Sequence, residues 1–226
     1  MNPNTKEINI EGTKYILVDL TQKLRLDTEV FPGDPKPQRK VFSSIESGYE
    51  HYTHSIGDHN FTPHGDAPKH QNPDSQEKGF DCWGIDRVFN QAYLINLDGK
   101  VEIRKEDLEP HAGKIATASA LILRTGYDRH LEENRPHIPE KIPYLNAEAA
   151  DLIANFKNLK VLGIDSITVD PMGIHHAHQA LSHLLIVESL VHLHEIPSNE
   201  FSLQTSPVKI EGATGGPVVA FAYIKA

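Results

Sequence analysis

The sequence predicts an α/β fold built as one domain over residues 1–226. Three apolar runs, residues 92–97, 120–124 and 160–164, are typical of buried strands. A helical segment begins after Asn146, between the second and third of these runs. Strand, helix and strand in that order favour an α/β domain, and 226 residues lie within the range of one large domain. With 38% hydrophobic and 23% charged residues, the composition is that of a folded globular protein.

The amino-terminal part of the chain is expected to form strands and turns. Residues 15–20 are a short apolar run that predicts a strand, and residues 39–56 have the mixed composition of strands or a hairpin. Between them, Pro and Gly within residues 31–35 predict a turn with the character of a surface connection. Pro and Gly within residues 57–70 exclude a regular helix. This last segment is therefore expected to be a strand that runs into a rigid, extended loop.

The rest of the chain is expected to alternate helices, loops and strands. Residues 127–144 contain three Pro and many charged residues and are expected to be exposed. Asn146 is a suitable N-cap for a helix that ends near Phe156. Asp165 directly follows the third buried strand, and ligands tend to bind at open strand ends in α/β domains. Two final strands are expected within residues 207–224, separated by glycines.

Composition excludes several classes of partner and site. The net charge of -9 and the scattered Lys and Arg leave no basic surface of the kind that binds nucleic acid. No apolar run approaches the roughly 20 residues of a membrane-spanning helix, and the amino-terminal residues lack the apolar core of a signal peptide. We therefore expect a cytoplasmic protein with no membrane partner. Because Cys82 is the only cysteine, neither an internal disulfide nor a cysteine-rich zinc site is possible.

Four residues in the predicted strand and loop that follow the hairpin are able to bind a cation or move a proton. Successive side chains of an extended backbone point to opposite faces, so Asn60, His64, Asp66 and His70 would share one face. Loops held by Pro and Gly often carry functional residues. The segment is therefore a candidate metal or catalytic site.

A second group of candidate ligands lies further along the chain. Most of the fourteen His residues fall in two windows, residues 51–70 and 175–194. Glu188 follows the apolar run 184–187, and a carboxylate among apolar neighbours is costly unless it is paired or metal-bound. A straight helix would hold the early histidines of this window about 18 Å from Glu188, so they could meet only if the chain turns near Ser182. Each of these histidines alone is more typical of an exposed helix surface; the two windows together favour a site.

The segment His64-Gly-Asp66-Ala-Pro68-Lys-His70 resembles the signature of the cyclase-like metal-dependent hydrolases, whose best-described members are bacterial kynurenine formamidase and isatin hydrolase. The family signature also has a His four residues before the first of these positions. Further segments resemble the family in the same order and cover nearly the whole chain. They are Val18-Asp19-Leu20, residues 31–35, residues 123–126, residues 163–166, Asp170-Pro171, the spacing from His176 to Glu188, and residues 209–213.

This resemblance implies a mixed β-sheet core with flanking helices, of the swivelling β/β/α type, around a divalent metal centre. Zinc, or alternatively manganese, would be bound as one or two ions. The resemblance also implies a homodimer or higher homo-oligomer that acts on a small-molecule substrate. Its functional positions fall on the metal ligands His64, Asp66, His176 and Glu188, with Asp66 shared by two ions, on the catalytic His70, and on Phe31 as a substrate contact.

The chain departs from the family signature at one position, because Asn60 stands where the signature has its first His. An amide oxygen is a poorer zinc ligand than imidazole, and hard cations accept it more readily. His59 is adjacent, but in a regular strand it would point the other way and could replace the missing ligand only if the backbone shifted. The first metal site therefore uses Asn60, uses His59, prefers another metal such as manganese, or is weakened.

These residues and the resemblance together predict metal-dependent hydrolysis of an amide bond in a small molecule, and the resemblance implies an N-formyl aryl amide or a cyclic amide as the substrate. The ion would activate water by lowering its pKa to about 7, and His70 would pass a proton to the leaving nitrogen. The alternative is a non-catalytic small-molecule-binding member of the family with a degraded first metal site. A metal-free hydrolase is disfavoured, because Cys82 lies in no nucleophile-elbow motif.

Overall fold

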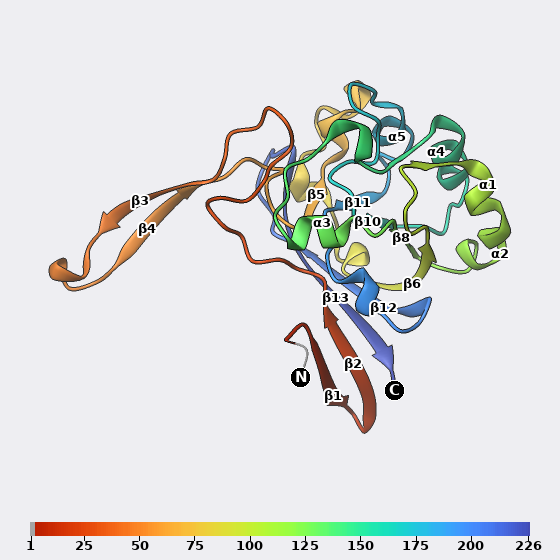
Figure 1. Ribbon diagram of the computed structural model, residues 1–226, viewed down its shortest axis with the longest axis horizontal. Helices are drawn as coiled ribbons and strands as arrows, with labels where there is room; N and C mark the ends of the chain where they lie inside the picture. Colours follow the sequence, from red (N-terminus) through yellow and green to blue (C-terminus); the bar gives the residue numbers. More distant parts are fainter. Residues whose placement is uncertain (1–2) are drawn as a thin grey trace.

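The computed structural model describes residues 3–226 and is built around a mixed β-sheet, which has nine strands within this part of the chain (Figure 1). The strands lie in the order β1-β2-β13-β12-β6-β8-β10-β11-β5. Their bounds are β1 Thr5–Ile10, β2 Thr13–Asp19, β5 His64–Asp66, β6 Phe89–Asn96, β8 Ala120–Arg124, β10 Val161–Ile164, β11 Leu185–Glu188, β12 Glu200–Pro207 and β13 Gly215–Lys225.

The sheet closes on itself through its shortest strand. Strand β5 pairs antiparallel with β11 on one side and antiparallel with β13 on the other, so the seven strands from β13 round to β5 form a barrel-like core. Strands β6, β8, β10 and β11 run parallel to one another. Closure therefore places all three residues of β5 in a buried position between two other strands.

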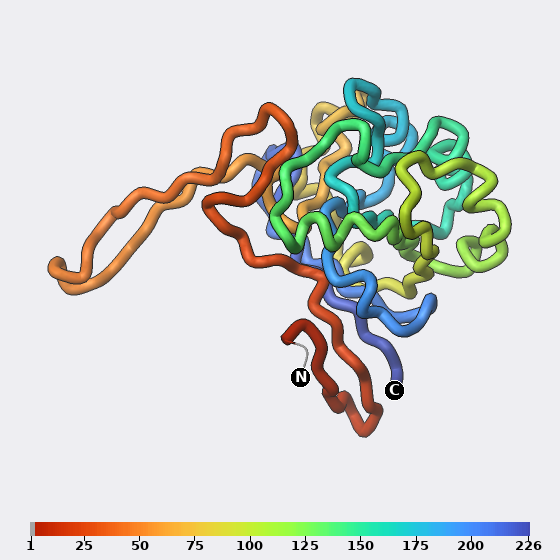
Figure 2. Tube along the Cα trace, in the orientation of Figure 1, coloured from red at the N-terminus to blue at the C-terminus, as the bar shows by residue number. Residues whose placement is uncertain are grey.

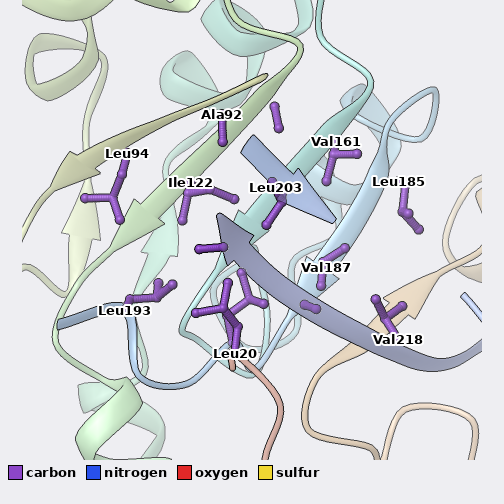
Figure 3. Close-up of a cluster of buried hydrophobic side chains, with 14 of the residues drawn as sticks. Leu20, Ala92, Leu94, Ile122, Val161, Leu185, Val187, Leu193, Leu203 and Val218 are labelled. Carbon is purple, nitrogen blue, oxygen red and sulfur yellow. The ribbon is translucent and has the colours of Figure 1, made fainter. Parts of the chain in front are cut away.

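The apolar pattern of the strands explains how they are covered. The residues Ala120-Leu-Ile-Leu123 of β8 and all of β10 are buried, as expected for parallel strands packed on both faces. Alternate residues of β13 face inward, and Val218 belongs to an apolar cluster with Ile122 of β8, Val187 of β11 and Leu203 of β12 (Figure 3). A second apolar cluster lies between the outer face of the sheet and the helices. The predicted α/β class, with a mixed sheet and flanking helices, is confirmed.

Short helices cover the outside of the parallel strands. They are α1 Lys105–Leu108, α2 Ala112–Ile115, α3 Asp128–Glu132, α4 Ala147–Ala154 and α5 His176–Ala180. Helices α1, α2, α4 and α5 lie together on one side of the sheet, and α3 lies apart from them (Figure 1). Helix α4 begins as predicted, because the Asn146 side chain accepts a hydrogen bond from the Ala149 N–H at 2.9 Å. No helix in residues 3–226 has the length and apolar character needed to cross a membrane.

Two small sheets lie outside the barrel. Strands β7 (Glu102–Ile103) and β9 (Tyr144–Leu145) form a short parallel pair. Strands β3 (Gln38–Ser43) and β4 (His51–Ser55) form the predicted hairpin, which projects from the body as a long arm (Figure 2).

Three predicted segments differ from the structure. Of the two strands expected within residues 207–224 only β13 is found there, because β12 ends at Pro207 and residues 208–214 form no strand. Residues 57–63 form turns and bends instead of a strand, and regular pairing begins only at His64. The loop expected to extend to His70 is a 3-10 turn from Pro68. Residues 127–144 are only partly exposed, because Leu131 of α3 and Ile142 pack into a third apolar cluster. Local composition missed these features because contacts with distant strands and loops impose them.

Candidate metal centre

Two neighbouring strands and one helix bring four titratable side chains together. His64 on β5 lies directly opposite Glu188 on β11 in the sheet register, and Asp66 ends the same short strand. His178 comes from helix α5, which lies outside the sheet near this end of the barrel. All four residues are at least 95% buried. The cluster thus collects two carboxylates and two imidazoles away from solvent.

The separations within this cluster fit the ligands of a small divalent cation. His64 Nε2 lies 3.2 Å from Glu188 Oε2, and His178 Nε2 lies 3.3 Å from both Glu188 Oε1 and Asp66 Oδ2. His64 Nε2 is 3.9 Å from Asp66 Oδ1. A tetrahedral zinc site with bonds of about 2.0–2.1 Å places neighbouring ligand atoms roughly 3.3–3.4 Å apart.

Acceptors outside the cluster fix which ring nitrogens face it. His178 Nδ1 lies 2.6 Å from Asp170 Oδ2, and that carboxylate also accepts the N–H groups of Ala177 and His178. His64 Nδ1 lies 3.1 Å from the Phe61 carbonyl oxygen, which can only accept. Both Nδ1 atoms therefore carry hydrogen, and Nε2, which faces the carboxylates, is the nitrogen that is free to bind a metal ion when the ring is neutral. Metal-binding histidines are commonly held in this way.

The electrostatics of the cluster favour bound positive charge. Burial opposes ionisation of every member, but the interactions among them outweigh it. Hydrogen bonds with Asp170, Asp66 and Glu188 raise the pKa of His178 well above its usual value, and Glu188 raises the pKa of His64. The histidines in turn hold the pKa of Asp66 well below its usual value and lower that of Glu188. Two buried carboxylates of this kind attract a cation.

His70 lies beside the cluster without belonging to it. The 3-10 turn Pro68–His70 places its ring 4.0 Å from the ring centroid of His59 and 5.6 Å from that of His178. Burial lowers the pKa of His70 to about 4, so the ring is neutral near pH 7. The Gln71 amide nitrogen, 3.1 Å from His70 Nε2, holds the ring in place.

A cavity of about 250 Å³ opens onto these residues. His64, His70, His178 and Glu188 line the cavity, together with an apolar wall of side chains that includes Phe31. A small molecule in this cavity would therefore meet both the candidate ligands and the neutral histidine.

The structure brings together most of the residues predicted from the sequence. His64, Asp66 and Glu188 are in the cluster, and His70 and Phe31 line the same cavity. Asn60 also lines the cavity: its Nδ2 donates to the Pro35 carbonyl at 2.8 Å, while its buried Oδ1 has no hydrogen-bond partner.

The structure does not bring His176 to the site, so its assignment as a ligand is corrected. Its side chain is 45% exposed, and its Nε2 lies 2.8 Å from Asp151 Oδ1. His178 lies in the cluster where His176 was expected, because residues two apart on a helix point in nearly opposite directions. The predicted turn between the histidines and Glu188 does occur, at residues 181–184.

Three residues near the cluster were missed or left open by sequence reasoning. Asp170, which matched the family only as a segment, orients His178. His178 is one of several histidines in residues 175–194, and in the sequence it differs from the predicted ligand His176 only by a spacing of two residues. His59 faces the cluster because the chain bends before β5, with its Nδ1 3.1 Å from Asp66 Oδ1.

A barrel-like mixed sheet with buried histidines and carboxylates at one end defines a class of candidate metalloproteins. The family model described as putative cyclase matches residues 18–171, and the chain belongs to this family. Kynurenine formamidase from Sphingopyxis alaskensis is 30% identical over 216 residues, which cover 89% of this chain and 95% of the relative. Kynurenine formamidase from Bacillus cereus is 27% identical over 207 residues, covering 90% and 95%.

Solved structures share the fold at lower identity. Isatin hydrolase A from Labrenzia aggregata, bound to benzyl benzoate, has a TM-score of 0.77 and 20% identity, and the match covers 93% of this chain and 94% of the other. A structure described as a potential metal-dependent hydrolase with cyclase activity has a TM-score of 0.73 and 19% identity, covering 92% and 98%.

Proposed function

We propose that this protein is a metal-dependent hydrolase that cleaves an amide-type C–N bond in a small molecule. One observation carries the proposal: two buried carboxylates, Asp66 and Glu188, face the Nε2 atoms of two histidines whose Nδ1 atoms are bound to outside acceptors. Membership of the putative cyclase family and the similarity to kynurenine formamidases support the same activity.

The ligand set suits a divalent metal ion. His64, Asp66, His178 and Glu188 would hold it, and the two oxygens of Asp66 allow one or two ions. Nitrogen and carboxylate ligands suit zinc, and manganese also fits. When bound, the ion supplies Lewis-acid chemistry, polarising the amide carbonyl and lowering the pKa of water.

The remaining residues of the cavity bind substrate and move protons. The neutral His70 accepts a proton from the attacking water and passes it to the leaving nitrogen. Phe31, on the apolar wall, packs against the substrate. The size and apolar wall of the cavity suit an N-formyl aryl amide or a cyclic amide.

We also propose that the protein acts in the cytoplasm as a homodimer or higher homo-oligomer, without nucleic acid or membrane partners. The net charge of -9 supports the exclusion of nucleic acid. Exposed apolar side chains on the β3–β4 arm, among them Val41 and Phe42, support self-association.

The test combines metal analysis with an assay on a panel of aryl formamides and cyclic amides. Wild-type protein purified without a tag or chelator should contain zinc or manganese and hydrolyse at least one amide. Asp66→Ala should lose the metal and the activity, whereas Asp81→Ala, an exposed carboxylate outside the cluster, should retain both. Metal binding without hydrolysis of any amide would favour a non-catalytic binding protein, and absence of metal after incubation with either ion would exclude the proposal.

A further inference from the structure

A chain of hydrogen bonds runs toward the candidate metal centre from the side opposite His178. Asp58 Oδ2 accepts from the Thr214 backbone N–H at 2.9 Å and from the Thr214 hydroxyl at 2.8 Å. A carboxylate has no hydrogen to give, so the hydroxyl hydrogen of Thr214 is committed to Asp58. Toward any other neighbour, Thr214 Oγ1 can only accept.

That neighbour is His59. Its Nε2 lies 3.2 Å from Thr214 Oγ1, so Nε2 carries the hydrogen of this bond. In the neutral ring, Nδ1 is then unprotonated, and it lies 3.1 Å from Asp66 Oδ1. Two lone pairs that face each other at this distance repel unless positive charge lies between them.

We infer that His59 Nδ1 is a ligand of the divalent ion held by His64 and Asp66, and that His59 replaces the first histidine of the family signature in place of Asn60. The inference rests on the proposed function and identifies one more ligand of the same site. The ligand atoms of His59, His64 and Asp66 all lie within 4.8 Å of one another.

The same rule then orients all three histidines of the centre. His64 donates outward to the Phe61 carbonyl and His178 to Asp170, as His59 does to Thr214. In its neutral form each ring therefore turns its free nitrogen toward Asp66, Glu188 or both. Asp66 lies between them, with Oδ1 facing His59 and Oδ2 facing His178. This arrangement defines two overlapping ligand groups that share Asp66.

The ring of His59 has little freedom to turn away. A Cβ placed on Gly215 would lie 2.5 Å from His59 Cε1 and 2.9 Å from Nδ1, so the absence of a side chain at this position makes room for the imidazole. The ring of His70 packs against it at a centroid distance of 4.0 Å, tilted by 32°. Asn60 is less suited to the role, because its Nδ2 is bound to the Pro35 carbonyl and it can offer only its amide oxygen Oδ1, a poorer zinc ligand than imidazole.

Cobalt binding to the metal-free, full-length protein tests this assignment without an activity assay. Calorimetry gives the number of equivalents, and the visible absorption of Co²⁺ reports its ligand field. His59→Ala should lose one equivalent or weaken it at least 100-fold, and Asn60→Ala should bind as wild type. Thr214→Val, which removes the acceptor that fixes the ring, should weaken the same equivalent about 10- to 100-fold, and Thr214→Ser should restore it. His54→Ala, on the exposed arm, is the matched histidine control.

The outcomes separate this inference from the proposed function. Unchanged cobalt binding by His59→Ala, or loss of an equivalent by Asn60→Ala, would overturn the assignment of His59 and leave a metal centre in place. If wild-type protein bound no cobalt, both proposals would fail. If circular dichroism showed that His59→Ala does not fold, His59→Gln, Thr214→Val and Thr214→Ser would provide the test. Normal cobalt binding by both His59→Gln and Thr214→Val would then overturn the inference.

Discussion

At the scale of single residues, His178 is held in place by a carboxylate outside the cluster. Asp170 accepts a hydrogen bond from its ring and others from two backbone N–H groups at the start of α5. The carboxylate thereby fixes both the helix and the tautomer of the side chain it carries. His176, two residues earlier, shares the helix but not the site.

These neighbours give a matched pair of variants. We expect His178→Ala to lower metal affinity at least 100-fold and to abolish amide hydrolysis, because it removes a buried ligand. His176→Ala should change neither by more than about twofold, because it removes only an exposed pair with Asp151, worth about 0–1 kcal/mol. Elemental analysis and the amidase assay on both variants measure this. The reverse order of effects would restore the assignment made from the sequence spacing.

Asp165 has a structural role, although its place after β10 suggested ligand binding. Its carboxylate is fully buried and accepts hydrogen bonds from the backbone N–H groups of Thr125, Gly126 and Tyr127 and from the Thr125 hydroxyl. It therefore ties the end of β10 to the loop that follows β8. Ligand binding at this strand end would first require these bonds to break.

We expect Asp165→Ala to lower the free energy of unfolding by about 3–5 kcal/mol, because several buried donors lose their acceptor at once. Asp98→Ala is the control: it breaks an ion pair with Arg124 in which the aspartate is 47% exposed, and it should cost about 1 kcal/mol or less. Urea unfolding followed by circular dichroism measures both. Equal effects of the two substitutions would contradict the structural role of Asp165.

At the scale of elements, the sequence predicted those parts of the fold that depend on local chemistry. Strands β8 and β10 are continuous apolar runs, and α4 begins at a residue that caps it. Strand β5 and the bend before it depend on pairing with β11 and β13, which lie more than 100 residues away in the chain. Local alternation therefore placed His59 and Asn60 on opposite faces, whereas the bend leaves both beside the cavity.

The sequence likewise predicted the part of the candidate site that depends on local spacing, but not the part that depends on tertiary packing. His64, Asp66 and His70 follow a fixed spacing within one segment, so a sequence motif identifies them. The choice between His176 and His178 depends on how a five-residue helix is rotated against the barrel. The bond from Asp170 sets that rotation, and no periodicity in so short a helix reveals it.

The β3–β4 arm is the element whose structure is least explained by a single copy of the chain. Val41 and Phe42 are neighbours on β3, where the pairing with β4 shifts register between Val41 and Ser43, and both are about two-thirds exposed. A two-stranded hairpin with no apolar face covered is marginally stable in water. We therefore expect a second copy of the chain to cover the arm.

The double substitution Val41→Ser and Phe42→Ser should shift the protein toward monomers, with at least a tenfold weaker self-association. The midpoint of thermal unfolding in the monomer should change little, because neither side chain contributes to the barrel core. Size-exclusion chromatography with light scattering over a range of concentrations measures the mass. Lys40→Ser, on the same strand, controls for loss of local structure. An unchanged mass would exclude the arm as the contact.

At the scale of the whole molecule, the candidate ligands lie across the seam at which the barrel closes. His64 and Asp66 come from β5, Glu188 comes from β11, and His178 comes from a helix outside the sheet. A bound ion would therefore cross-link the closing strand to its neighbour and to α5. Metal binding should then stabilise the entire fold, since an ion that binds only the folded chain shifts the unfolding equilibrium.

The free energy of unfolding of the metal-free protein should fall as pH rises, which is opposite to the pH effect expected when metal is bound. The pKa values of His64 and His178 are raised in the folded chain, so their stabilising contribution is complete below the usual value of 6.5 and is lost as pH rises through the raised values. The lowered pKa values of Asp66 and Glu188 give a contribution that is present above the usual carboxyl range and lost in more acidic solution. Metal-free protein should therefore be most stable at about pH 5–6 and less stable toward pH 9.

Zinc or manganese should reverse this trend, because the ion needs unprotonated histidines and replaces the protons that the cluster otherwise attracts. At a hundredfold excess over the dissociation constant, the ion should add about 2.7 kcal/mol to the free energy of unfolding. The increment should grow from pH 5 to pH 8. Thermal unfolding of chelator-treated protein with and without added metal, measured across this range, provides the data. Asp66→Ala should lose the metal increment at every pH, and an equal increment at pH 5 and pH 8 in wild type would show that the ion does not displace protons from this cluster.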